Sequence, residues 1–263
     1  MNTSYLSLLI QRQAQKYGER VALKYRDYAT SMWIPVSWNQ FSEKVSKVSR
    51  ALVALGVQAQ ENIGVFSQNK PECLYTDFGA FGVRAVTVPL YATSSEAQVH
   101  YILQDAAIRF LFVGEQYQYD VASRVQNLCH TLKRIIVFDS SVKLAPGDTN
   151  SLYYEDFLAL GDNMELQQQV DKLTAESSPQ DLANILYTSG TTGESKGVML
   201  HHSCYEAAFK AHHGRLTTLG EQDVVMNFLP FTHIFERAWS YYCLDRGCVL
   251  CINLRPQDIQ KTI

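Results

Sequence analysis

The chain has 263 residues, of which 46% are hydrophobic and 19% charged, and its formal net charge is −3. This is an ordinary globular composition with enough apolar residues for a core, and it shows no basic excess that would indicate nucleic-acid binding. Residues 1–12 lack the basic leader of a signal peptide, and no stretch approaches the roughly 18 apolar residues of a membrane span. We therefore expect a cytoplasmic protein, with peripheral attachment to the inner membrane face as the alternative.

Helical and strand periodicities alternate along the chain. In chain order we predict a helix over 6–17, a hairpin of strands over 21–25 and 32–36, and a helix from 37 to 56. A strand over 62–67, a helix from 71, a strand over 85–90 and a helix from 94 or 95 to 106 are expected next. The series ends with a strand over 109–113, a helix over 116–129 and a strand over 134–138. Ser37 followed by Gln40 forms a capping box, and Pro71 suits a first helical turn. Repeated β-α units predict the α/β class, with a mostly parallel sheet covered by helices on both faces.

Two polar breaks interrupt this pattern, at residues 140–150 and 177–180. Because the first contains Pro146 and Gly147, we predict a surface loop there. At the second we place a subdomain boundary, which divides the chain into residues 1–180 and 181–263. The second segment is predicted to contain strands over 182–188, 196–200, 223–229 and 248–253, with helices beginning near 202 and after 233. Residues 258–263 read as the start of a helix without a stop signal, so we expect a longer parent chain.

The segment that most clearly indicates chemistry reads YTSGTTGESKG and occupies residues 187–197. Glycine lets a backbone approach a ligand closely, and successive N–H groups can then form an anion-binding nest. The Ser and Thr hydroxyls add donors, and Lys196 adds a positive charge, so we predict a phosphate-binding loop. The glycine spacing fits neither the Walker loop nor the dinucleotide fingerprint. The alternative is a flexible connection without a ligand.

Residues 185–201 resemble the AMP-binding signature of adenylate-forming enzymes, with Ser195 where that family usually has proline. A second segment, FLPFTHIFER at 228–237, is similar to the Leu-Pro-x-x-His-x-Phe-Glu-Arg motif of long-chain fatty acyl-CoA synthetases. Residues 64–70 and 88–91 resemble the same branch, so the resemblance covers essentially the whole chain. It implies an acyl-CoA synthetase-like N-terminal domain.

The resemblance implies a two-step reaction in which a fatty carboxylate and ATP give acyl-adenylate and pyrophosphate, and coenzyme A then displaces AMP to form a thioester. ATP, Mg²⁺ and coenzyme A are the implied cofactors and cosubstrates. The residues that the resemblance assigns to the ATP phosphates are Thr188, Ser189, Gly190, Thr191, Thr192, Gly193 and Lys196. The expected catalytic residues are Thr191, Lys196 and His233.

His233 is expected near the acyl carboxylate or adenylate, although a packed histidine at a helix N-terminus is the alternative. Phe235 and Trp239 are candidates for an acyl tunnel or for the core. Glu236 and Arg237 are expected to pair with each other or to contact a second subunit.

We predict no metal site formed by the protein alone. Cys248 and Cys251 lie three apart on an expected strand and so point to opposite faces, and no second Cys-x-x-Cys completes a zinc site. The adjacent pairs at 201–202 and 212–213 are histidines without a carboxylate cluster, so we interpret them as solvated or packed.

Two further readings stay open. One is a different acid substrate, of aryl or amino acid type, and the other is a non-catalytic association module. The chain alone is expected to make no acyl-CoA, and its apolar surfaces are expected to promote self-association. The expected partners are fatty acid, ATP and coenzyme A, without nucleic acid.

Overall fold

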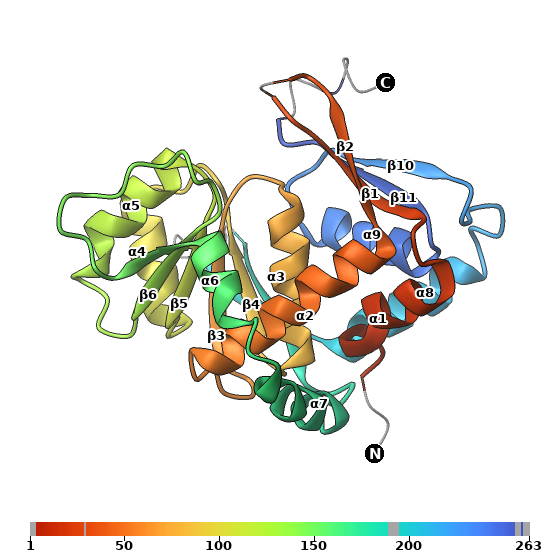
Figure 1. Cartoon of the computed structure of the whole chain (residues 1–263), viewed down its shortest axis with the longest axis horizontal. Coiled ribbons are helices and arrows are strands. Elements are labelled where there is room, and N and C mark those ends of the chain that lie inside the picture. The colour runs from red at the N-terminus through yellow and green to blue at the C-terminus, as the bar shows by residue number, and fades with distance from the viewer. Residues whose placement is uncertain (1–3, 29, 189–194, 256–258, 260–263) are drawn as a thin grey trace.

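The computed structural model describes residues 4–28, 30–188, 195–255 and 259. Figure 1 shows two β-sheets with helices packed around them, which confirms the predicted α/β class. The helices are α1 (Tyr5–Tyr17), α2 (Trp38–Ala54), α3 (Pro71–Gly82), α4 (Glu96–Asp105), α5 (Gln116–Gln126), α6 (Tyr154–Leu160), the 3-10 helix η1 (Met164–Leu166), α7 (Gln167–Ala175), α8 (His202–His213) and α9 (Ile234–Asp245). The strands are β1 (Val21–Arg26), β2 (Trp33–Ser37), β3 (Asn62–Phe66), β4 (Val86–Leu90), β5 (Phe110–Val113), β6 (Arg134–Val137), β7 (Ser151–Tyr153), β8 (Leu182–Thr188), β9 (Lys196–His201), β10 (Val224–Asn227) and β11 (Val249–Ile252).

The larger sheet has the strand order β7-β6-β5-β3-β4-β8-β9. All neighbouring strands are parallel except β8 and β9, which form an antiparallel hairpin. The chain runs from β3 to β4 in one direction and then crosses back to β5 on the other side of β3. The strand order therefore reverses between β3 and β5, and the carboxyl edge beside such a point is where open α/β sheets bind ligands.

Side chains of β5 show how this sheet separates two cores. Phe110 and Phe112 belong to the hydrophobic cluster shared with α1, α2, α3 and α6. Leu111 and Val113 belong to the cluster shared with α4 and α5. Successive side chains of a strand point to opposite faces, so a continuous apolar run is what a sheet covered on both faces requires. Figure 1 shows α4 and α5 on one side of the sheet and α2, α3 and α6 on the other.

The smaller sheet has the order β10-β11-β1-β2 and joins distant parts of the chain. The predicted hairpin of β1 and β2 is confirmed, and β1 also pairs in parallel with β11. Helices α1, α8 and α9 pack between this sheet and the larger one, in the red, cyan and blue parts of Figure 1. The boundary between residues 180 and 181 stays a prediction, and each sheet contains strands from both segments.

Local capping signals were informative about helix starts. The Ser37–Gln40 capping box is present, and Ser95, not Ser94, opens α4 through a second box with Gln98. Two predicted elements were too long. The helix after 116 ends at Gln126 because the chain turns there, with the Cys129 N–H bonded to the Gln126 carbonyl, and β10 is confined to Val224–Asn227.

Residues 151–175 contain four elements for which the sequence provided no prediction, namely β7, α6, η1 and α7. They are short, and α6 and α7 are fixed by packing against α2 and α3, which no local periodicity reveals. The helix start expected at 258–263 lies almost wholly outside the described residues. In the part of the chain that the structure describes, no helix has the length and apolar character needed to span a membrane.

Helices α2 and α3 approach closely at Gly79, where an added Cβ would lie 2.4 Å from Val48 Cγ1. A side chain at this position would force the two helices apart. The close contact fixes the carboxyl half of α3 against α2, and the loop before α3 follows the carboxyl end of β3 directly.

Candidate active site

The predicted phosphate loop connects the two strands of a hairpin. Strand β8 ends at Thr188 and β9 begins at Lys196, and these two residues are directly paired across the antiparallel ladder. Both side chains are exposed. The predicted phosphate ligands Ser189, Gly190, Thr191, Thr192 and Gly193 lie outside the described residues. The structure therefore places the hydroxyl of Thr188 and the ammonium of Lys196 at the same end of the hairpin.

Helix α4 holds both strands of this hairpin close to the loop. The Tyr101 hydroxyl donates a 3.0 Å hydrogen bond to the Ser195 carbonyl, and the Tyr187 hydroxyl donates to the carboxylate of Asp105. Burial, with Asp105 adding to its effect, raises the pKa of Tyr187 well above its ordinary value, so this phenol stays protonated as the donor. Sequence reasoning missed Tyr101 and Asp105 because they lie on a helix about 90 residues before the motif.

The segment containing His233 begins helix α9. His233 is its N-cap residue, and its N–H donates to the Pro230 carbonyl at 2.9 Å, which closes a turn. The imidazole is exposed and meets the ring of Tyr91 edge-on, with 5.4 Å between ring centroids. Tyr91 directly follows β4, so His233 lies at the carboxyl edge of the larger sheet.

The register of β4 and β8 brings the two predicted parts of the site to one edge. Thr87 of β4 pairs with Asn184 of β8 in a parallel arrangement. Tyr91, which contacts His233, is four residues after Thr87, and Thr188, which begins the phosphate loop, is four residues after Asn184. Neighbouring strands are about 4.8 Å apart, so this register places the two segments at adjacent strand ends.

Asn69 fixes the turn before His233. Its side-chain amide donates to Asn227 Oδ1 at 2.7 Å and to the Leu229 carbonyl at 2.8 Å, and its Oδ1 accepts the Phe231 N–H at 2.9 Å. Asn69 is buried, and it follows β3 by three residues. In the sequence, Asn69 could have been noticed as a polar residue just after a buried strand. Only the fold shows that its hydrogen-bond partners lie in residues 227–231.

Glu236 and Arg237 were expected to pair with each other or to contact a second subunit, and the structure gives different roles. Glu236 Oε2 accepts the Leu229 N–H at 3.0 Å, whereas Arg237 forms a buried ion pair with Asp77 of α3. Arg237 also donates from Nε to the Phe231 carbonyl at 2.8 Å. Both side chains therefore hold the turn in place, and neither is available on the surface.

Phe235 and Trp239, the candidates for an acyl tunnel, differ in exposure. Phe235 is 64% exposed, whereas Trp239 is half-buried and lies beside Tyr242 with 6.0 Å between ring centroids. Trp239 is thus part of the packing of α9. Phe235 is free to contact a ligand or another part of the protein.

A cavity of about 220 Å³ opens where strands of both sheets end. The lining residues come from the loops after β3, β4, β10 and β11 and are Ser67, Gln68, Asn69, Tyr91, Ala92, Thr93, Phe228, Pro230, Thr232, Asn253 and Leu254. Within the described residues, Thr232 Oγ1 and Gln68 Oε1 are buried and lack a hydrogen-bond partner. Because buried polar groups are nearly always bonded, these two atoms suit a polar part of a ligand. The volume is below the usual range for a whole small-molecule ligand.

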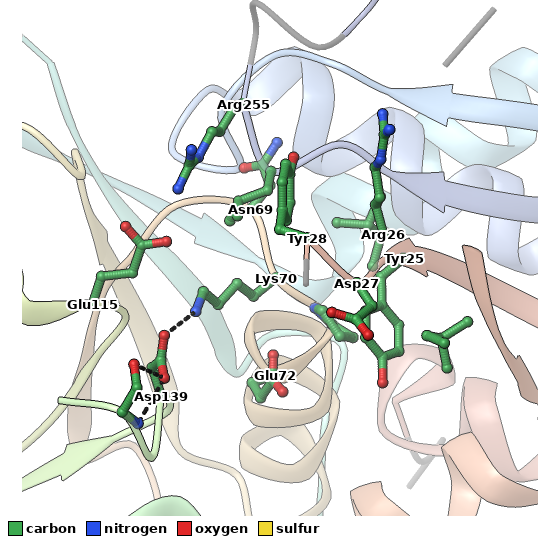
Figure 2. A pocket seen from close by; sticks show the side chains of 15 residues that line it. Tyr25, Arg26, Asp27, Tyr28, Asn69, Lys70, Glu72, Glu115, Asp139 and Arg255 are labelled. Carbon is green, nitrogen blue, oxygen red and sulfur yellow. Dashed lines mark hydrogen bonds and ion pairs between the residues drawn. The ribbon is translucent and has the colours of Figure 1, made fainter. Parts of the chain in front are cut away.

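A larger cavity of about 770 Å³ lies beside it and shares Asn69 and Leu254 with it. This cavity is at the carboxyl ends of β3, β5 and β6 and under the hairpin of β1 and β2. Figure 2 shows the Lys70 side chain pointing toward Asp139, with 3.7 Å between the charged atoms. Burial alone would raise the pKa of Asp139, but the hydroxyl and N–H of Ser141, together with Lys70, lower it overall. Burial raises the pKa of the half-buried Glu72.

The cysteines and histidines that raised the question of a metal have local packing partners. Cys248 Sγ lies 3.2 Å from the Gly220 carbonyl, and Cys251 is buried on the following strand. His202 Nδ1 shares a 2.8 Å hydrogen bond with Ser4 Oγ, and burial lowers its pKa to about 4. Among the described residues no three His, Cys, Asp or Glu side chains gather as a metal site would need.

Comparison with known proteins assigns this arrangement to a family. The chain is 29% identical over 86% of its length to the long-chain-fatty-acid–CoA ligase ACSBG2 of Xenopus laevis, and 32% identical over 77% of its length to fatty acyl-CoA synthetase A of Dictyostelium discoideum. It spans 30% of the length of each of these relatives.

Among solved structures, an anthranilate CoA ligase, AuaEII, in complex with anthranoyl-AMP superposes over 100% of this chain and 47% of its own, with a TM-score of 0.84 and 20% identity. This likeness shows the fold. A sequence profile of the AMP-binding enzyme family matches residues 10–262. The chain therefore belongs to the AMP-binding enzyme family.

Proposed function

We propose that the whole protein to which this chain belongs activates long-chain fatty acids with ATP and transfers the acyl group to coenzyme A, and that residues 1–263 alone make no acyl-CoA. The observation that carries the proposal is the convergence of Thr188 and Lys196 with the Tyr91–His233 contact at neighbouring strand ends, within a chain of the AMP-binding family. Relatives named as fatty acid–CoA ligases support the acid class.

In the first step a carboxylate oxygen of the fatty acid attacks the α-phosphorus of ATP, the bond to the β-phosphate breaks, and pyrophosphate leaves. The reaction brings an anion against a polyanion. We propose that Lys196 and the loop residues 188–193 bind the phosphates and offset this repulsion. His233 would orient the carboxylate or the adenylate from the neighbouring strand end, with Thr191 and Lys196 as its catalytic partners.

In the second step the sulfur of coenzyme A attacks the acyl carbonyl, AMP leaves with the electrons of the broken bond, and the thiol proton is lost to solvent or base. We propose that Thr232 and Gln68 contact a polar part of the acyl-adenylate, because both residues line the cavity and each has a buried oxygen without a protein partner. Mg²⁺ usually binds through substrate phosphates and keeps several waters, so we expect it to arrive with ATP, and we assign no step to it.

The test is an acid panel with the purified protein, from acetate through palmitate to anthranilate, measured as acid-dependent exchange of pyrophosphate into ATP. With the whole protein, we expect palmitate to give the fastest exchange and Lys196→Ala to slow it strongly. Fastest exchange with anthranilate would instead favour an aryl acid, the second candidate, which the fold neighbour with anthranoyl-AMP suggests. No exchange with any acid would favour an association module.

A second stage of the test adds coenzyme A and measures thioester formation. Thioester formation by residues 1–263 alone would contradict the expectation that this chain makes no acyl-CoA by itself.

We also propose a cytoplasmic protein that attaches peripherally to membranes, and co-sedimentation with phospholipid vesicles would test this. Sedimentation velocity would test self-association through exposed residues such as Met199 and Val224, on the edge strands β9 and β10.

A further inference from the structure

A chain of buried polar side chains links the strand that leads to the phosphate loop with the turn that carries His233. It begins at Asn184 on β8, whose Nδ2 donates to Thr87 Oγ1 at 2.5 Å. Thr87 in turn donates to Asp77 Oδ1 at 2.8 Å. The other oxygen of Asp77 accepts from Arg237, and Arg237 Nε reaches the Phe231 carbonyl at 2.8 Å.

Two tyrosines close the network at its ends. Tyr205 of α8 donates to Asn184 Oδ1 at 2.7 Å, and Tyr241 of α9 donates to Asp77 Oδ2 at 2.7 Å. Every member is at most 1% exposed. The network thus lies wholly inside the protein and spans α3, β4, β8, α8 and α9.

An ion pair at this depth requires a reason other than stability. Removing two charges from water is costly, and apolar residues of similar volume are often as stabilising or more so. What a guanidinium provides and an apolar side chain does not is a rigid planar fork with fixed donor directions. In Arg237 that fork joins the Asp77 carboxylate to the Phe231 carbonyl, two residues before His233.

The other end of the network lies on the two strands whose ends form the site. Thr87 and Asn184 face each other across β4 and β8. Asn184 is four residues before Thr188 at the end of β8, and Thr87 is four residues before Tyr91, which directly follows β4. At those ends are Tyr91, against which His233 packs, and Thr188, where the loop begins. The same set of hydrogen bonds therefore fixes both the His233 turn and β8, the strand before the loop, relative to Thr87 and Asn184.

We infer that the Asn184–Thr87–Asp77–Arg237 network is a positioning device that sets His233 in register with the phosphate loop for adenylate formation. This inference rests on the proposed function. The four residues touch neither substrate nor reacting atoms, so they act through the Phe231 carbonyl and the strand ends. Misplacing a reacting group by about 1 Å can cost about 100-fold in rate, which sets the expected size of the effect.

The test variant is Asp77→Leu/Arg237→Met, which replaces the ion pair by apolar side chains without leaving a buried charge. The matched control is Asp181→Leu/Arg84→Met. That pair has 2.9 Å between Arg84 Nε and Asp181 Oδ2, and it joins the turns before the same strands β4 and β8 at their amino ends. Both variants remove an Arg–Asp bridge, but the first bridge joins α3 to α9 beside the His233 turn, whereas the second lies at the amino ends of β4 and β8.

In pyrophosphate exchange, we expect the Asp77→Leu/Arg237→Met variant to lose about 100-fold in kcat with less than about threefold change in KM for ATP. The control should stay within about threefold of the unchanged protein in both. Wild-type kcat in a folded test variant, or equal losses in both variants, would overturn the inference.

A second measurement decides the inference without activity. Thr87→Val keeps the shape of the side chain but cuts the link between Asn184 and Asp77. Hydrogen–deuterium exchange should become about tenfold faster at the amides of residues 229–235 while the amides of α5 stay unchanged, since local opening follows lost contacts. Unchanged exchange at 229–235 would overturn the inference even if the double variant did not fold. Absent exchange activity in the unchanged protein would count against the proposed function alone.

Discussion

The hairpin of β8 and β9 and the turn over residues 228–233 lie at one edge of the same sheet, yet they are held differently. The turn is fixed by the buried side chains of Asn69, Glu236 and Arg237. The hairpin is held at its base by packing and near its tip by single contacts from α4, while Thr188 and Lys196 are exposed. Exposed donors remain available to a polyanionic ligand, whereas a residue that must orient one carboxylate needs a fixed backbone. The predictions below test this difference, from the largest expected effect to the smallest.

The largest effect is expected for removing one charge of the buried pair. Asp77→Leu leaves the Arg237 guanidinium buried without a counter-ion, which should cost about 3–5 kcal/mol of stability. The Asp77 carboxylate raises the pKa of Arg237 overall, against the lowering by burial, so the guanidinium keeps its charge. The measurement is the midpoint of urea unfolding. Asp156→Leu on the exposed face of α6 is the control and should change stability by less than about 0.5 kcal/mol.

If Asp77→Leu loses no more stability than the Asp156→Leu control, the contrast between a rigid turn and an exposed loop is wrong. In that case the turn would be held by packing alone.

The base of the hairpin gives the second prediction. His202 directly follows β9, and burial lowers its pKa to about 4. The folded protein therefore favours the neutral imidazole. The resulting stability is fully present above the ordinary histidine pKa of about 6.5 and is lost as pH falls toward 4, to a total of about 3 kcal/mol. Unfolding midpoints between pH 7.5 and pH 4 would measure this loss.

His202→Asn, which cannot gain a proton in this range, should flatten that part of the pH profile. The exposed His130→Asn is the matched control and should leave it unchanged. Identical profiles for the two variants would mean that acid destabilises the protein elsewhere.

The exposed cation of the loop gives the third prediction. Lys196→Ala removes a charge-assisted hydrogen bond to phosphate, which is worth about 1.5–3 kcal/mol, so ATP affinity should fall by about 10- to 150-fold. Stability should not change because the side chain is exposed. Calorimetric titration with ATP measures the affinity, and Lys210→Ala on α8 controls for the change in net charge. Unaltered affinity in Lys196→Ala would rule out the phosphate-binding role.

The smallest effect is expected at the contact between α4 and the loop. Tyr101→Phe removes the hydrogen bond to the Ser195 carbonyl, worth about 1 kcal/mol, and should raise the KM for ATP by about fivefold. Tyr117→Phe is the matched control because its hydroxyl also donates to a backbone carbonyl, that of Ser94, at 3.1 Å. Equal KM values would show that the loop needs no support from α4.

Local sequence determined the strand and helix periodicities, the capping boxes at Ser37 and Ser95, and the motifs around Lys196 and His233. These depend on neighbouring residues, whose backbone preferences and spacing are visible in any single chain. The periodicity also indicated a sheet covered on both faces, because β5 is apolar throughout and β6 is apolar after Arg134.

Only the tertiary structure decided which side chains hold those motifs. Arg237 looked like a partner for the adjacent Glu236, but its counter-ion is Asp77, 160 residues earlier in the chain. Tyr101 and Asn184 lie outside the motifs, and their place in the site, like the partners of Asn69, became visible only through strand order and register. A buried charge selects whatever opposite charge the packing brings within reach, and that choice depends on contacts between distant segments that no local pattern records.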